Sequence, residues 1–157
     1  MKKIQEPNPL NDVAEFHQTF NLPILENPVI PDSERCKLRI NLIEEELNEL
    51  KEAIEANDLT EVADAFCDIQ YVLSGAILEF GLGDNFKLLF EEVQRSNMSK
   101  TCKSLESAQA TQEYYNNKDG TESELVKRGE EYIVFRKSDG KVLKSVNYSP
   151  ANLDQFL

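Results

Sequence analysis

The chain has 157 residues and a formal net charge of −12, with 40% hydrophobic and 29% charged residues. This length allows one good hydrophobic core, and the composition is that of a folded protein rather than a disordered acidic tail. A protein this acidic repels nucleic acid unless a basic patch overrides the repulsion, and the sequence contains no such patch. The whole acidic excess lies in residues 1–98, whereas residues 99–157 are neutral. We therefore expect a core domain over 1–98 and a C-terminal extension over 99–157.

Neither a membrane segment nor an export signal is predicted. Lys2 and Lys3 are followed by polar residues and prolines instead of the apolar stretch of a signal peptide. No apolar run approaches the roughly 20 residues that a membrane span needs. The three cysteines, Cys36, Cys67 and Cys102, are odd in number and widely spaced, which argues against a disulfide framework or a thiolate zinc site. We expect a protein of the reducing cytoplasm with no membrane partner.

Four helices are predicted in the core domain, at residues 11–20, 33–56, 59–80 and 84–96. Asn11 is expected to cap the first helix, and Asp32 or Ser33 the second. The prolines between residues 21 and 31 require an extended connector. Residues 57–58 form a tight turn, and Gly81 and Gly83 end the third helix.

The extension has a different character. One more helix is predicted over residues 104–116. Glu131–Arg136 and Lys141–Val146 are strand-like runs on either side of Asp139-Gly140, and Asp-Gly between two such runs is typical of a hairpin. We therefore predict a β-hairpin over residues 131–147. The predicted fold class is mainly α: an antiparallel bundle of four main helices with an extension that contains a β-hairpin.

The glutamates of the second helix do not all face the same way. At about 100° per residue, the apolar stripe that faces the core consists of Ile43, Leu47, Leu50 and Ile54. Glu46 lies about 60° from Ile43, and Glu49 lies further round on the same side. Glu45 projects to the far side, where the remaining glutamates form a solvated face. Glu46 and Glu49 therefore border the core.

The third helix carries acids on one side of an apolar stripe that consists of Val62, Phe66, Ile69, Leu73, Ile77 and Phe80. Its short turn after the second helix requires antiparallel packing, which brings Glu46 and Glu49 level with Asp64 and Asp68. We call these four residues the carboxylate cluster. Like charges at contact distance raise one another's pKa and need a compensating partner. Mg²⁺ accepts such ligands together with substrate phosphates, so the cluster suggests a metal site that handles a polyphosphate.

Other interpretations stay open at this point. Asp58 and Glu61 fit a capping box, so Glu61 could simply close its own helix. Glu46 could pair with Arg39, seven residues earlier. The acidic side could also belong to a non-enzymatic helical module for oligomerisation or binding, with a structural cation between its helices.

Two motifs on the successive helices resemble those of a known family. Glu45-Glu46-Leu47-Asn48-Glu49 and then Glu61-Val62-Ala63-Asp64 are similar to the ExxE and ExxD pair of the all-α nucleoside triphosphate pyrophosphohydrolases. That MazG-like superfamily includes dimeric dUTPases and phosphoribosyl-ATP pyrophosphohydrolase. The segments that look most like the latter subgroup are residues 12–17, 39–47, 64–75, 96–100 and 139–144.

The resemblance implies an enzyme that depends on Mg²⁺, with Mn²⁺ as an alternative. It would cleave a nucleoside or deoxynucleoside triphosphate, or a related nucleotide, to the monophosphate and pyrophosphate. Relatives assemble from several subunits, and apolar surface on both sides of the third helix also favours a homodimer or a dimer of dimers.

The same resemblance implies the roles of individual residues. The metal ligands would be Glu46, Glu49, Glu61 and Asp64, with Glu45 as a further ligand or as the base that positions water. Asn97 and Lys100 would contact the nucleotide or its phosphates, and a triphosphate needs cationic partners in so acidic a domain. Further candidates for substrate contacts are Asp68, from its place in the carboxylate cluster, Arg39, and His17, from its position beside Phe16 and Phe20.

Overall fold

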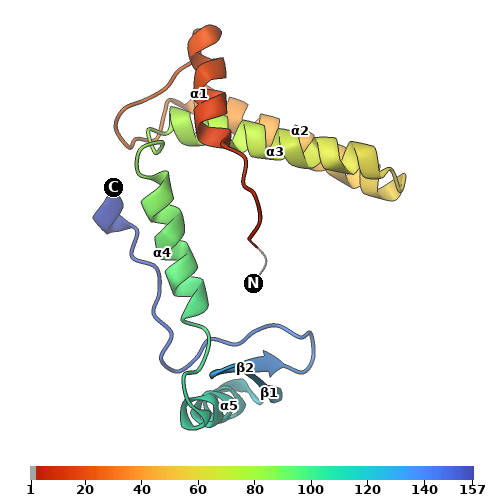
Figure 1. Ribbon diagram of the computed structural model, residues 1–157, viewed down its shortest axis with the longest axis vertical. Coiled ribbons are helices and arrows are strands. Elements are labelled where there is room, and N and C mark those ends of the chain that lie inside the picture. The colour runs from red at the N-terminus through yellow and green to blue at the C-terminus, as the bar shows by residue number, and fades with distance from the viewer. Residues whose placement is uncertain (1–2) are drawn as a thin grey trace. The chain divides into compact units, whose positions relative to one another are not determined.

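The computed structural model describes residues 3–157, which form two compact units (Figure 1). The first unit, up to Phe86, contains helices α1 (Pro9–Thr19), α2 (Ser33–Glu55) and α3 (Leu59–Glu79). The second unit, Lys87–Leu157, contains nearly all of α4 (Phe86–Met98), then α5 (Leu105–Asp119), β1 (Ser123–Arg128), β2 (Glu131–Arg136) and the 3-10 helix η1 (Asp154–Phe156). The predicted mainly α fold with a C-terminal hairpin is confirmed. Within residues 3–157, none of the helices is long and apolar enough to cross a membrane.

The first helix begins earlier than predicted. Pro9 occupies its first turn, where the missing backbone N–H of proline costs no helical hydrogen bond. Asn8 is the N-cap residue, and the side chain of Asn11 donates to Asn8 Oδ1 at 2.7 Å. The predicted cap at Asn11 is therefore wrong, because Asn11 lies inside the first turn.

Helices α2 and α3 form the predicted antiparallel pair, with α1 packed against α3 (Figure 1). Asp32 caps α2 by accepting from the backbone N–H groups of residues 34 and 35, each at 3.0 Å. Asp58 caps α3 by accepting from Thr60 N at 2.9 Å and Glu61 N at 3.2 Å. Asn57, at the turn between the helices, has a φ of 54°, a left-handed conformation that asparagine tolerates well.

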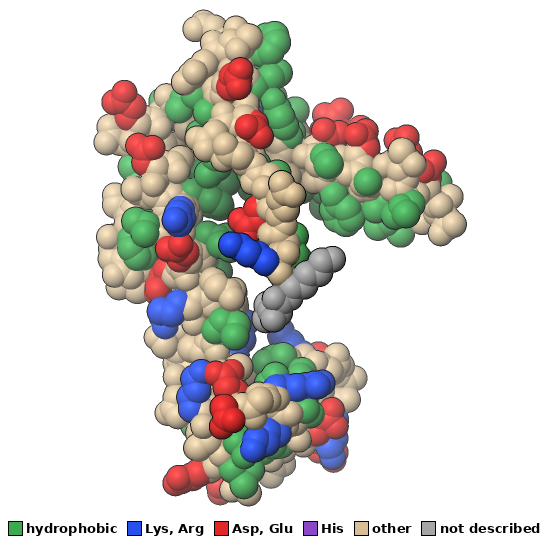
Figure 2. Space-filling model, in the orientation of Figure 1, with side chains coloured by type: hydrophobic (Ala, Val, Ile, Leu, Met, Phe, Trp, Pro, Cys, Tyr) green, Lys and Arg blue, Asp and Glu red, His purple; other side chains and the backbone are tan. Residues whose placement is uncertain are grey.

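The apolar stripes of this helix pair are only partly buried. Leu50 of α2 and Ala65 of α3 lie in the core. Four residues predicted to be core are instead exposed: Leu47 by 43%, Ile54 by 58%, Phe66 by 56% and Leu73 by 40%. Two helices cover only one side of each other, so stripes this wide cannot be buried within the pair. Figure 2 shows hydrophobic side chains gathered along one edge of the pair and acidic side chains along the other.

The second unit has its own core of buried side chains where α5 meets the hairpin. Its buried members are Cys102, Ala108, Val134 and Leu143, with Tyr115, Leu125 and Tyr132 packed against them. Helix α5 starts at a reciprocal capping box between Ser104 and Ser107 and ends at Gly120, whose φ of 74° suits glycine. The helix predicted over residues 104–116 is confirmed and is slightly longer.

The main hairpin of the structure lies earlier in the chain than predicted, because β2 is the predicted strand but its full-length partner precedes it. β1 pairs antiparallel with β2, in a register that joins residue 123 to 136 and 128 to 131. The predicted partner segment, 141–146, also turns back at Asp139-Gly140, but it meets β2 at a single bridge between Phe135 and Val142. That side of β2 is shared, because Tyr132 exchanges two backbone hydrogen bonds with Cys102, each at 2.8 Å. Residues 141–143 still lie antiparallel to the end of β2, with Arg136 N donating to the Lys141 carbonyl and Leu143 N to the Val134 carbonyl, each at 2.8 Å. The full-length partner of β2 is β1, which was not predicted.

Residues 141–153, which we call the C-terminal strap, return alongside α4 within the second unit (Figure 1). The backbone N–H of Asn152 donates to Glu92 Oε1 at 2.9 Å, and Arg95 donates to the carbonyl of Pro150 at 3.0 Å. Arg95 also donates to both carboxylate oxygens of Glu92, from Nε at 2.7 Å and from Nη2 at 2.8 Å. The hydrogen bonds from Arg95 and from the Asn152 backbone lower the pKa of Glu92 to about 2.

Candidate functional site

The carboxylate cluster is present on the facing sides of α2 and α3. Glu46 is half-buried, and this burial raises the pKa of its carboxyl group. The neighbouring negative charges raise that pKa further, in the order Asp68, Glu49, Glu45 and Asp64. Four other carboxylates thus act on one half-buried glutamate. Three of them, Asp68, Glu49 and Asp64, are expected from the turn and the helical spacing, whereas Glu45 was predicted to project to the far side. The mutual repulsion of the carboxylates lowers the stability of the folded protein when no cation is bound.

Glu61 lies one turn before Asp64 on α3, and its charge is not among those that raise the pKa of Glu46. It does not complete a capping box either, because the backbone N–H of Asp58 donates to Ala53 at 3.0 Å. Among residues 3–157, no three Asp, Glu, His or Cys side chains converge closely enough to hold a metal ion. The atoms that could ligate a metal here are nevertheless all carboxylate oxygens, which hard cations such as Mg²⁺ prefer. A cation at this place would also offset the repulsion among the carboxylates.

A buried ion-pair network lies further along the same helices. The carboxylate of Glu79 is 1% exposed and accepts from Arg39 at 2.5 Å and from Arg35. Burial acts to raise the pKa of Glu79, but the hydrogen bonds from Arg39 and Arg35 outweigh it and hold the pKa below its ordinary value. Arg39 therefore pairs with Glu79, and the alternative of a pair with Glu46 does not form.

His17 extends the network from α1. Its Nδ1 lies 2.8 Å from the carbonyl oxygen of Pro23, which can only accept, so Nδ1 carries the hydrogen. Nε2 is then free to accept from Arg39 Nη2 at 3.2 Å, which makes the ring neutral. A Cβ at Gly75 would lie 2.7 Å from Arg39 Nη1 and 3.0 Å from His17 Nε2, so only glycine allows this close approach.

A cavity of about 300 Å³ opens beside this network in the first unit. Phe16 and Tyr71 meet there edge to face, with ring centroids 5.6 Å apart. Arg39 Nε is buried without a hydrogen-bond partner among residues 3–157. An apolar pocket with a few polar groups and one unsatisfied donor has the form of a small-molecule site. Its lining consists of Val13, Phe16, His17, Leu22, Arg35, Leu38, Arg39, Leu42, Tyr71, Val72 and Gly75.

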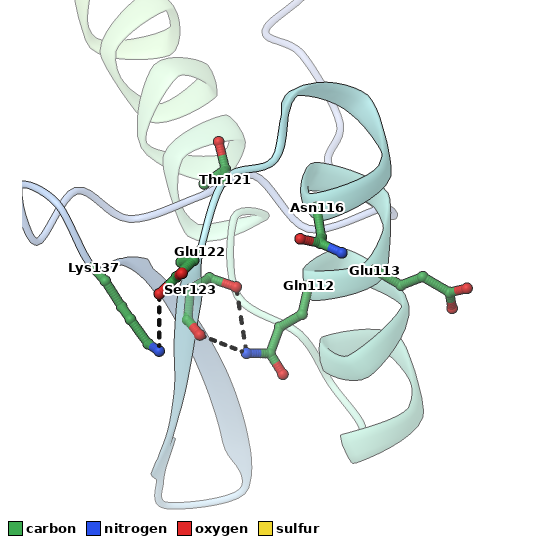
Figure 3. Close-up of a pocket in the computed structure, with 7 residues that line it drawn as sticks. All are labelled: Gln112, Glu113, Asn116, Thr121, Glu122, Ser123 and Lys137. Atoms are coloured by element: carbon green, nitrogen blue, oxygen red, sulfur yellow. Dashed lines mark hydrogen bonds and ion pairs between the residues drawn. The ribbon is translucent and has the colours of Figure 1, made fainter.

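A second cavity, of about 400 Å³, lies between α5 and the start of β1 (Figure 3). The amide of Gln112 donates to the carbonyl of Ser123 at 3.1 Å, and Lys137 faces Glu122 at 3.4 Å. These polar groups already satisfy one another, and none of the residues predicted for the site lines this cavity. Its lining consists of Gln112, Glu113, Asn116, Thr121, Glu122, Ser123 and Lys137.

Asn97 and Lys100 lie together at the end of α4 and just beyond it. The ammonium group of Lys100 donates to Asn97 Oδ1 at 2.7 Å. Both belong to the second unit, whereas the carboxylate cluster and the pair of His17 and Arg39 belong to the first. The structure thus places the predicted residues in three groups, with Glu61 one turn before Asp64 of the carboxylate cluster.

Sequence reasoning missed the partner of Arg39. Counting outward from the turn at residues 57–58, with about 1.5 Å per residue, places Glu79 between the levels of Arg35 and Arg39. Glu79 is also the one acid late in an apolar stretch of α3. A buried acid in such a position needs cationic partners on the facing helix, so this signal could have predicted the pair.

Comparison with known proteins agrees with the two motifs. The family model of phosphoribosyl-ATP pyrophosphohydrolase matches residues 13–97, which span α2, α3 and most of α1 and α4. An uncharacterized protein of Acanthamoeba polyphaga mimivirus is 24% identical over an alignment of 235 residues. That alignment covers 92% of this chain and 94% of the viral protein, so the likeness continues into the C-terminal extension. On the match over residues 13–97, this chain belongs to the phosphoribosyl-ATP pyrophosphohydrolase family.

Proposed function

We propose that this protein is a cytoplasmic, Mg²⁺-dependent pyrophosphohydrolase. Its substrate would be a nucleoside or deoxynucleoside triphosphate, or a related nucleotide, and its products the monophosphate and pyrophosphate. The observation that carries the proposal is the set of repelling carboxylates around Glu46, on the two helices that bear both motifs of the family. Three free cysteines, Cys36, Cys67 and Cys102, agree with a reducing compartment.

The residues that would hold the metal are Glu46, Glu49, Glu61 and Asp64. A bound Mg²⁺ or Mn²⁺ would neutralise phosphate charge and make a bound water more acidic. The raised pKa of Glu46 supports this assignment, because a cation at this point would offset the repulsion among the carboxylates. Asp68 would accept hydrogen bonds from water molecules that the metal holds, and Glu45 would accept the proton of the attacking water.

The cavity beside His17 and Arg39 is the proposed subsite for the nucleobase. Phe16 and Tyr71 offer aromatic surface against which a base can pack. The unsatisfied Nε–H of Arg39 is a donor for a carbonyl oxygen or ring nitrogen of the base. Because His17 is held as a neutral ring by Pro23 and Arg39, it adds a shape constraint rather than a charge.

Asn97 and Lys100 are proposed to contact the phosphates. An ammonium group forms charge-assisted hydrogen bonds with phosphate oxygens, and the first unit is poor in such groups. The bond between Lys100 and Asn97 holds the ammonium group in place, which reduces the entropy lost on binding.

We also propose a homodimer or a dimer of dimers. Leu47 and Ile54 are seven residues apart on α2, as are Phe66 and Leu73 on α3, and all four are exposed. Such a spacing repeats every two turns and is suited to packing against another helix. Light scattering at micromolar concentration should therefore give a mass of two or four chains.

A matched pair of variants tests the surface involved in that assembly. Leu73→Glu should lower the mass to that of one chain, whereas Leu105→Glu, at an exposed position on α5, should leave it unchanged. A single chain in the unaltered protein would contradict the proposed assembly.

Pyrophosphate release from a panel of nucleotides, with and without Mg²⁺, tests the proposed reaction. Activity is expected on at least one nucleotide and only with the metal. Glu49→Gln and Asp64→Asn should each reduce the rate by about 100-fold or more, since even outer-shell changes at metal sites cost 10- to 100-fold. Glu52→Gln, an exposed change on the same helix, should keep the activity.

Failure on every nucleotide, or full activity in both cluster variants, would overturn the proposal. Thermal melts then test the rival function of a helical module with a structural cation. Such a module should gain stability from Mg²⁺ without any nucleotide, because a ligand that binds only the folded state stabilises it.

A further inference from the structure

The C-terminal strap brings two further residues, Lys144 and Tyr148, next to the end of α4. The hydroxyl groups of Tyr148 and Ser96 are 3.0 Å apart, and the backbone N–H of Ser145 donates to the carbonyl of Lys100 at 3.3 Å. These contacts join residues about 50 positions apart in the chain. They lie within the second unit and surround the residues proposed to contact the phosphates.

Positive charge gathers around the Tyr148 ring. The ammonium nitrogen of Lys144 lies 4.4 Å from the ring centroid. The hydrogen bond with Ser96 lowers the pKa of Tyr148, and, against an opposing effect of burial, the charges of Lys144 and Lys100 lower it further. Within residues 3–157, neither lysine forms an ion pair with a carboxylate, although the protein has far more acids than bases. Two cations therefore act on one hydroxyl group with no counter-charge.

The strap is held firmly at this point. Ser96 and Ser145 are each 4% exposed, so the residues that position Tyr148 and Lys144 are themselves buried. Ser149 N donates to Ser99 Oγ at 3.0 Å, which fixes the strap on the far side of Tyr148. Lys144 itself is exposed, and Lys100 is half-buried. Groups fixed in this way lose little freedom when a ligand binds.

These groups offer hydrogen-bond donors to an anion. Each lysine presents an ammonium group, and the Tyr148 hydroxyl can donate outward when Ser96 donates to it. We propose that Lys144 and Tyr148, together with Lys100 and Asn97, bind the phosphate chain of a nucleotide. This inference rests on the proposed function for its substrate, but the cluster itself would recognise any diphosphate or triphosphate anion.

Calorimetric binding of inorganic pyrophosphate to the full chain, in EDTA, tests the proposal without turnover or metal. Lys144→Gln should weaken binding by about tenfold or more, the value of one hydrogen bond between charged groups. Lys144→Arg should retain most of the affinity, because it keeps the charge. Lys141→Gln makes the same charge change three residues earlier on the strap and should alter binding by less than about twofold.

Tyr148→Phe separates the hydroxyl from the ring. It keeps the aromatic face under Lys144 but removes the donor, so pyrophosphate affinity should fall, and loss of the hydrogen bond with the buried Ser96 should lower the melting temperature by a few degrees. In nucleotide hydrolysis, Lys144→Gln should raise KM more than it lowers kcat, as expected for a contact made in both ground and transition states.

The results distinguish this inference from the proposed function. Pyrophosphate binding that depends on Lys144, without hydrolysis of any nucleotide, would support the anion site and overturn the enzymatic proposal. Hydrolysis with unchanged KM and unchanged pyrophosphate affinity in both Lys144→Gln and Tyr148→Phe would overturn the anion site and leave the enzyme.

Discussion

Glu46→Gln is expected to raise the melting temperature of the metal-free protein and to abolish its Mg²⁺-dependent hydrolysis. The fold raises the pKa of Glu46, so the ionised carboxylate opposes folding at neutral pH. Glutamine has nearly the same shape without the charge, and it removes both the repulsion and a proposed metal ligand. The activity should fall by about 100-fold or more. Thermal melts in EDTA and a pyrophosphate-release assay measure the two effects.

The gain in stability should depend on pH. A carboxyl group with a raised pKa contributes full stability below its unfolded pKa, about 4.3, and loses it as the pH rises through the folded value. Glu46→Gln should therefore melt higher than the unaltered protein near neutral pH and equal to it in acid. Glu52→Gln, exposed on α2, serves as the control and should match the unaltered protein throughout. A lower melting temperature for Glu46→Gln at neutral pH would show that Glu46 is stabilising.

Arg39→Met should destabilise the protein by about 3–5 kcal/mol, because it leaves a buried carboxylate without its main partner. Glu79 is 1% exposed, and Arg35 alone would remain to compensate it. In a chain of this length 1 kcal/mol corresponds to about 2–4 °C, so the melting temperature should fall by roughly 10 °C. Denaturant unfolding and thermal melts both measure the change.

Two comparisons isolate the buried charge. Lys37→Met removes the cation of an exposed pair with Glu34 on the same helix and should cost at most about 1 kcal/mol. The double variant Arg39→Met and Glu79→Leu should recover most of the loss, because it removes the stranded charge as well. Equal losses in the single and double variants would mean that packing by the arginine side chain, not charge, accounts for the effect.

The sequence predicted correctly those features that depend on neighbouring residues alone. A short turn at Asn57 and Asp58 requires antiparallel helices, and helical spacing then places Glu46 beside Asp64 and Asp68, as the structure has them. These predictions depend on one turn and on the regular rise of a helix. The family match over residues 13–97 includes both of these helices.

Contacts between segments far apart in the sequence could not be predicted from local patterns. Local propensity favoured a hairpin about Asp139-Gly140, and that turn does form, but β2 also pairs along its full length with β1 on its other edge, which the sequence pattern did not predict. Likewise, the apolar spacing predicted that Leu47 and Phe66 are buried, whereas a single helix pair has too little surface to cover both. The strap depends on contacts across 50 to 60 residues, for which the sequence carries no local signal.

Because the strap is translated last, the second unit should finish folding later than the first during synthesis. The first unit is complete in sequence once Phe86 has left the ribosome. The second cannot close until Leu143 has entered its core and Asn152 has reached Glu92. Because domains fold as their sequences emerge, the helices that carry the carboxylates can form well before the strap is translated. Nascent chains that end before residue 143 should therefore contain a folded first unit joined to an unfinished second one.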